Sequence, residues 1–127
     1  MPPSLRTAFA LILCALPLSS LPLRAQSAPA PSSRLDRRMD SGIVENDGSE
    51  RRVLASFSVE EPGAIWMRLY FDELLLGGDE VAGNGSYVRI TSMLDGASQV
   101  LHASHATQWK NSSAYMNGDA VLVELIG

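Results

Sequence analysis

The chain has 127 residues, a formal net charge of −4 and a single cysteine, and its charges are unevenly distributed. From Val53 onward, three basic residues face nine carboxylates, a balance of −6, so this part should repel nucleic acids and anionic membranes. The cysteine, Cys14, lies in the N-terminal apolar stretch, and the remainder of the chain has no disulfide to stabilise it.

The N-terminus has the pattern of a secretory signal peptide. Arg6 provides a positive charge, residues 7–23 are almost entirely apolar, and Ala25 is a small residue placed before a cleavage point at Gln26. Two prolines interrupt the stretch, which is shorter than the about 20 apolar residues of a membrane-spanning helix. An uncleaved membrane anchor is the alternative. We predict a signal peptide over residues 1–25, a secreted or periplasmic protein, and no stable membrane span after cleavage.

Residues 26–52 are rich in Ser, Pro, Ala and charge, and they contain few large apolar side chains. Such a segment cannot bury enough apolar surface to offset the entropy lost on ordering, so we predict a disordered leader or linker. The pairs Arg37-Arg38 and Arg51-Arg52 resemble dibasic cleavage sites, with a charged, solvated linker as the alternative. The folded module is then residues 53–127.

The module begins with two runs in which apolar and polar residues alternate, the period of a half-buried strand. These are residues 53–59 and 64–71. Pro62-Gly63 between them predicts a turn, and therefore a hairpin. A helix over residues 65–76 competes with the second strand, but aromatic content and flanking glycines favour the strand.

Glycines bracket a loop over residues 77–85, and strand-like composition resumes at residues 87–93. Asp95-Gly96 predicts a tight turn, with residues 99–103 as the returning strand. Residues 104–113 are polar, and we expect them to be irregular.

Asn117-Gly118-Asp119 predicts a last hairpin, between strands at residues 114–116 and 120–126. The final apolar run ends one residue before the chain does, which a terminal strand or an incomplete module would explain. Six or seven short strands at regular spacing predict an all-β fold, specifically a small antiparallel, jelly-roll-like β-sandwich.

Residues with catalytic or metal-binding chemistry are few. On a strand, the spacing of His102 and His105 places them on opposite faces, so we interpret them as exposed or capping residues and not as joint metal ligands. The carboxylates of Asp72-Glu73, Asp79-Glu80 and Asp119 can ligate Ca²⁺ or form a solvated acidic face. No spacing resembles a calcium loop, a phosphate-binding loop or a nucleophile motif. We predict no metal, no cofactor and no enzymatic activity.

Four aromatic residues are the candidate binding residues. Their rings can stack on sugars or on proline-rich peptides, and the alternative is that they belong to the core. They are Trp66, Tyr70, Trp109 and Tyr115.

Three stretches carry a resemblance: W-M-R-L-Y-F at 66–71, R-I-T-S-x-x-D-G at 89–96 and S-x-Y-x-N-G-D at 113–119. They resemble the pre-catalytic β-sandwich region of secreted bacterial trypsin-like serine proteases, in which a signal and a variable leader precede the sandwich and the peptidase follows. The resemblance covers residues 64–126 and includes no catalytic His, Asp or Ser motif.

The resemblance implies a non-catalytic accessory module that binds a substrate, the cell surface or a peptidase domain. The chain would then be a fragment that lacks the peptidase, or a stand-alone copy of the module. The alternative is an independent envelope or extracellular protein that binds a glycan or a peptide.

Overall fold

The computed structural model describes residues 31–127, so the predicted signal peptide and the cleavage residues Ala25 and Gln26 lie outside the described part. The chain divides into one unit that ends at Asp36 and a second unit that begins at Arg37. All described strands and the described helix belong to the second unit. In chain order these are β1 (Val53–Glu60), β2 (Trp66–Met67), β3 (Tyr87–Ser92), β4 (Ser98–Leu101), α1 (Ala103–Gln108), β5 (Met116–Asn117) and β6 (Ala120–Ile126).

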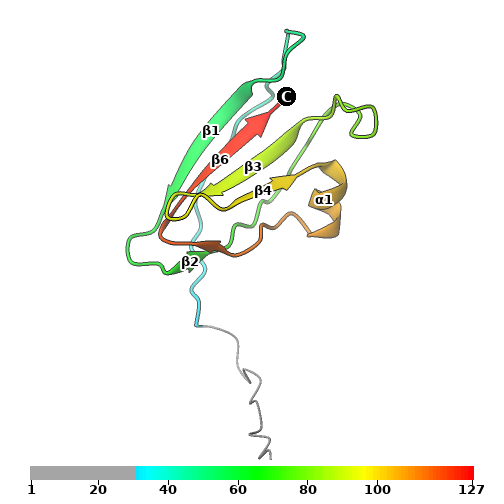
Figure 1. Cartoon of the computed structure of the whole chain (residues 1–127). Helices are drawn as coiled ribbons and strands as arrows, with labels where there is room; N and C mark the ends of the chain where they lie inside the picture. Colours follow the sequence, from blue (N-terminus) through cyan, green and yellow to red (C-terminus); the bar gives the residue numbers. More distant parts are fainter. Residues whose placement is uncertain (1–30) are drawn as a thin grey trace, which may run out of the picture. The chain divides into compact units, whose positions relative to one another are not determined.

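Antiparallel strands dominate the second unit, which confirms the predicted all-β fold. Four strands form one sheet in the order β1-β6-β3-β4, and β2 pairs with β5 in a second, two-stranded sheet. Figure 1 shows β6 between β1 and β3, with α1 following β4 at the end of the sheet. The finer description as a jelly-roll-like sandwich stays a prediction.

Strand pairing differs from the predictions at two of three turns. The hairpin at Asp95-Gly96 is confirmed and joins β3 to β4. The predicted hairpin at Pro62-Gly63 does not form. The turn is present, but β1 pairs with β6 and β2 pairs with β5. The prediction of a hairpin at Asn117-Gly118-Asp119 is also wrong, because β5 and β6 belong to different sheets. Turn residues specify a change of direction, whereas the burial of each apolar face decides which strands pair.

The core combines buried residues of both sheets. On β3, Val88 and Ile90 are buried and alternate with more exposed residues, as expected of a sheet with one covered face. Met67 of β2 and Met116 of β5 belong to the same buried cluster. Residues of both sheets therefore share one buried apolar cluster, which stabilises the fold.

The turn after β3 and the turn before β6 meet in what we call the turn junction (residues 92–95 and 117–118). The Ser92 hydroxyl donates to the Asn117 carbonyl at 2.8 Å, and the Asn117 amide donates to the Asp95 carboxylate at 2.7 Å. These turns lie within two stretches that carry the sequence resemblance, 89–96 and 113–119. The residues of the junction therefore have a structural role, because they join the two turns.

Part of the segment predicted as a leader contacts the four-stranded sheet. Residues 31–52 contain neither helix nor strand. The Asn46 side-chain amide and the Arg52 backbone N–H each donate to the Gly127 carbonyl, both at 2.9 Å. The Arg51 guanidinium donates to two carbonyls of the glycine-rich loop that precedes β3. These bonds attach the Arg51-Arg52 pair to the sheet end.

Candidate functional site

Three of the four candidate aromatic residues lie in or next to the β2–β5 pair: Trp66 in β2, Tyr115 just before β5, and Tyr70 at an isolated bridge to Ser112. The predicted alternation over residues 64–71 holds here: Met67 is buried, and Leu69 and Phe71 pack against the core. The residues between them, Trp66, Arg68 and Tyr70, fall on the opposite side because successive side chains of an extended chain alternate. Ile65 departs from the pattern, being 82% exposed.

Two buried serines, Ser112 and Ser113, fix the backbone next to this face through hydrogen bonds. The Ser113 hydroxyl accepts a hydrogen bond from the Leu69 N–H at 2.9 Å and donates to the Ala114 carbonyl at 2.6 Å. The Ser112 hydroxyl donates to the Trp109 carbonyl at 2.7 Å. Both serines are almost fully buried, so these partners offset the cost of removing their hydroxyls from water.

Arg68 is fixed by the same two serines. Its Nε donates to the Ser113 carbonyl at 3.0 Å, and its Nη2 donates to the Ser112 hydroxyl at 2.8 Å. The guanidinium carbon lies 5.1 Å from the ring centroid of Tyr70 and 5.2 Å from that of Tyr115. Both distances fall within the about 6 Å range of a cation–π interaction.

Trp66 extends this cluster on the Tyr115 side. The rings of Trp66 and Tyr115 meet edge to face, with centroids 5.0 Å apart and an interplanar angle of 79°. Tyr70 and Tyr115 are 62% and 64% exposed, so their rings are surface groups and not core residues. We call Trp66, Arg68, Tyr70 and Tyr115 the aromatic–arginine surface.

Trp109, the fourth candidate aromatic residue, lies elsewhere. It is the C-cap of α1 and is 42% exposed. It is linked to the aromatic–arginine surface through its backbone carbonyl, which accepts from Ser112. Sequence reasoning grouped Trp109 with the other aromatic residues and left out Arg68. The available signal for Arg68 was its position midway between Trp66 and Tyr70 in the alternating run.

His102 and His105 lie together, which corrects the prediction that they face opposite ways. The helix α1 occupies the end of the predicted strand, Ala103, and the first half of the stretch expected to be irregular, and His102 is its N-cap. Residues three apart on a helix share a face, so the two rings have centroids 5.5 Å apart. Nδ1 of His105 accepts a hydrogen bond from the His102 N–H at 3.4 Å. Nδ1 of His102 is buried without a hydrogen-bond partner within residues 31–127.

Glu80 connects the glycine-rich loop to the first turn of α1. Its carboxylate accepts from the Ser104 hydroxyl at 2.8 Å and from the Ser104 N–H at 3.1 Å. These hydrogen bonds, with a smaller contribution from the nearby imidazoles of His102 and His105, lower the pKa of Glu80 below its ordinary value of 4.5. The ionised carboxylate therefore stabilises the start of the helix.

Replacing Glu80 with glutamine is expected to destabilise the protein at pH 7 more than at pH 3. Because folding lowers the pKa of Glu80, its stabilising contribution is complete above 4.5 and is lost as the pH falls through the folded-state value. Urea unfolding of both chains at the two pH values, followed by circular dichroism, measures the difference. A Ser104→Ala background should reduce it, and an equal effect of Glu80→Gln at both pH values would contradict the assignment.

Asp79, the neighbour of Glu80, has local partners. The Asp79 carboxylate accepts hydrogen bonds from the N–H groups of Val81 and Ala82, which is a turn-stabilising arrangement. Within residues 31–127, no three His, Cys, Asp or Glu side chains are close enough together to hold a metal ion.

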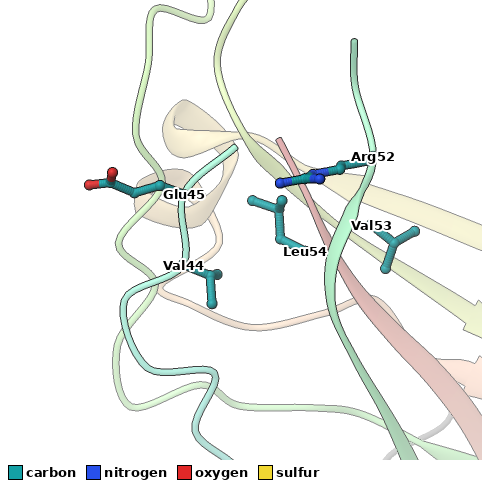
Figure 2. A pocket seen from close by; sticks show the side chains of 5 residues that line it. All are labelled: Val44, Glu45, Arg52, Val53 and Leu54. Carbon is teal, nitrogen blue, oxygen red and sulfur yellow. The ribbon is translucent and has the colours of Figure 1, made fainter. Parts of the chain in front are cut away.

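A hollow that is open to solvent lies between residues 44–45 and the start of β1. Figure 2 shows Arg52 and Leu54 extending from the β1 side toward the segment with Val44, while Glu45 points away. Its lining combines one cation, one outward-pointing carboxylate and aliphatic side chains, and no set of polar groups converges there. It does not resemble a small-molecule site, which brings a few polar groups together in an apolar pocket.

Comparison of the chain with protein-family models, curated proteins and solved structures finds no significant match. In the part of the chain that the structure describes, no helix is both long and apolar enough to cross a membrane.

Proposed function

We propose that this protein is a non-catalytic binding module that acts outside the cytoplasm and contacts a glycan or peptide ligand through the aromatic–arginine surface. The observation that carries the proposal is the arrangement of Arg68 between the exposed rings of Tyr70 and Tyr115, with Trp66 against Tyr115. Exposed, clustered aromatic side chains are typical of binding surfaces, where one ring face remains free to stack.

The concentration of aromatic residues supports this proposal. The whole chain has only two tryptophans and three tyrosines, and one of the former and two of the latter lie on this surface. Rings held in place before a ligand arrives lose little conformational entropy on binding. The hydrogen bonds of Arg68 to Ser112 and Ser113 provide such a fixed arrangement.

A role beside a secreted trypsin-like serine protease is the second proposal, and it rests on the sequence resemblance. Two of the stretches that carry the resemblance meet in the turn junction, whereas the third contains Trp66, Arg68 and Tyr70. In this proposal the module binds the substrate, the cell surface or the peptidase domain. Capture of a purified secreted trypsin-like peptidase by the immobilised chain would support it, and absence of capture would count against it.

Replacing Trp66 or Tyr115 with alanine is expected to lower ligand affinity at least about tenfold, because each change removes a ring that the ligand would contact. Glycan and peptide arrays first identify a ligand of the full chain, and titration calorimetry then measures its affinity for each variant. Trp109→Ala is the matched control, because this exposed tryptophan lies outside the aromatic–arginine surface.

Thermal unfolding of each variant separates binding from folding. Tyr115 is the more exposed side chain, so Tyr115→Ala should leave the unfolding midpoint nearly unchanged. If ligand affinity depends on Trp109 and not on Trp66 or Tyr115, the binding surface has been assigned to the wrong face. If Trp66→Ala prevents folding, Tyr115→Ala decides the question.

A further inference from the structure

Arg68 is a half-buried cation that has only neutral hydrogen-bond acceptors. Its Nε and Nη2 donate to a backbone carbonyl and to a hydroxyl. The four ion pairs within residues 31–127 involve Arg34, Arg37, Arg52 and Arg89, and none includes Arg68. Its charge therefore remains available to an external anion.

The other arginine after residue 52 is paired with a carboxylate. Arg89 lies on β3 and donates to the Glu124 carboxylate on the neighbouring strand at 2.8 Å. After residue 52 the basic residues are only Arg68, Arg89 and Lys110, against nine carboxylates. Although so many acidic groups are present, the guanidinium of Arg68 is paired with none of them in the described part.

Such an arrangement favours a carboxylate in direct contact with Arg68, an attraction that must outweigh the repulsion between a polyanion and the module's balance of −6. Two aromatic rings flank the guanidinium and, with its two hydrogen bonds, hold it in place for an anion. The planar guanidinium can match the two oxygens of a carboxylate, provided that its remaining N–H groups face the ligand. The exposed rings beside it then contact the uncharged part of the same ligand.

We propose that the ligand of the aromatic–arginine surface is an acidic polysaccharide built from uronic acid units, an inference that rests on the proposed binding function. Sugar rings offer apolar C–H faces to Trp66, Tyr70 and Tyr115, and each uronate offers a carboxylate to Arg68. Peptide recognition usually needs pockets for side chains. Two hollows open to solvent are lined by residues between 44 and 54 and include no residue of this surface.

The first experiment compares a carboxylate polymer with its uncharged methyl ester. Affinity electrophoresis of the full chain in gels that contain polygalacturonate, or the same polymer with its carboxyls methyl-esterified, gives the two affinities. We expect at least tenfold weaker binding to the ester, because the ester removes the charge that Arg68 would contact. Alginate and hyaluronate extend the test to other uronate polymers, and polyglutamate provides a carboxylate-bearing peptide. This comparison needs no variant that could fail to fold.

Variants then assign the effect to Arg68. Arg68→Gln should reduce polygalacturonate binding at least tenfold, and Arg68→Lys should restore part of it, because lysine keeps the charge but not the planar fork. Arg89→Gln is the matched control, an arginine already paired within the sheet. Thermal unfolding checks that each variant is folded.

The remaining outcomes distinguish this inference from the proposed function. Equal binding to the acid and the ester, lost in Trp66→Ala, would overturn the uronate inference and leave the binding surface supported. Binding to polyglutamate and to none of the uronate polymers would do the same. No binding to any polymer, glycan or peptide would overturn both.

Discussion

Replacing Ile90 with alanine is expected to lower the free energy of unfolding by about 2–5 kcal/mol. Ile90 lies on β3, its side chain is 0% exposed, and its neighbours across the sheet are Val123 on β6 and Gln99 on β4. The substitution removes apolar contacts and leaves a cavity that the surrounding strands can fill only in part. Because small domains have about 5–15 kcal/mol of stability in total, this single change would remove a large share of it.

Urea unfolding followed by circular dichroism measures the effect of Ile90→Ala. Thr91→Ala is the matched control, since Thr91 is the next residue of the same strand and is only partly buried. The control should change the free energy of unfolding by less than about 1 kcal/mol. Similar losses in the two variants would show that the core does not lie on the Ile90 side of β3.

Replacing Gly118 with alanine is expected to cost about 2–4 kcal/mol of stability, because backbone strain and steric overlap act together. Gly118 has a φ of +89°, and an added Cβ would lie 2.7 Å from the Cβ of Leu94. Its N–H also donates to the Ile65 carbonyl at 2.9 Å, which connects the turn junction to the chain leading into β2. Relief of the overlap would therefore disturb contacts of both sheets.

Gly96→Ala is the matched control for the backbone term. Gly96 has a φ of +73°, but an added Cβ there would meet no atom within 4 Å. This variant should lose only about 1–2 kcal/mol, the cost of the left-handed conformation alone. Thermal and urea unfolding of the two variants measure the difference, and equal losses would mean that Leu94 does not restrict position 118.

The alternating pattern predicted which faces are buried more reliably than it predicted strand pairing. Val53–Glu60 and Tyr87–Ser92 are strands as predicted, because apolar side chains at every second position can be buried together only on an extended chain. The helix Ala103–Gln108 was missed. It has six residues and no apolar periodicity. A hydrogen bond from the His102 N–H to the His105 ring and hydrogen bonds from Ser104 to the distant Glu80 favour it. Such long-range partners leave no local signal.

The candidate site was predicted only in part, again because some of its contacts join residues far apart in the sequence. An aromatic residue in a strand can face the core or the solvent, and the pattern alone left both open for Trp66, Tyr70 and Tyr115. The alternating pattern placed Trp66 and Tyr70 on one side and Met67 on the other, but it did not indicate which of the two sides was buried. Arg68 was overlooked because its importance depends on Tyr115 and two buried serines, which lie more than 40 residues away in the sequence.

The sequence by itself determined the acidic balance of the module, the alternation that makes it an all-β fold and the positions of its turns, because these depend on residues close together in the chain. It also contains the predicted export signal, which lies outside the described residues. Only the tertiary structure decided that β1 pairs with β6, that β2 pairs with β5, and that Arg68 lies between two exposed tyrosines. These features depend on which apolar faces are buried together, and that choice minimises the free energy of the whole domain and not of any one segment.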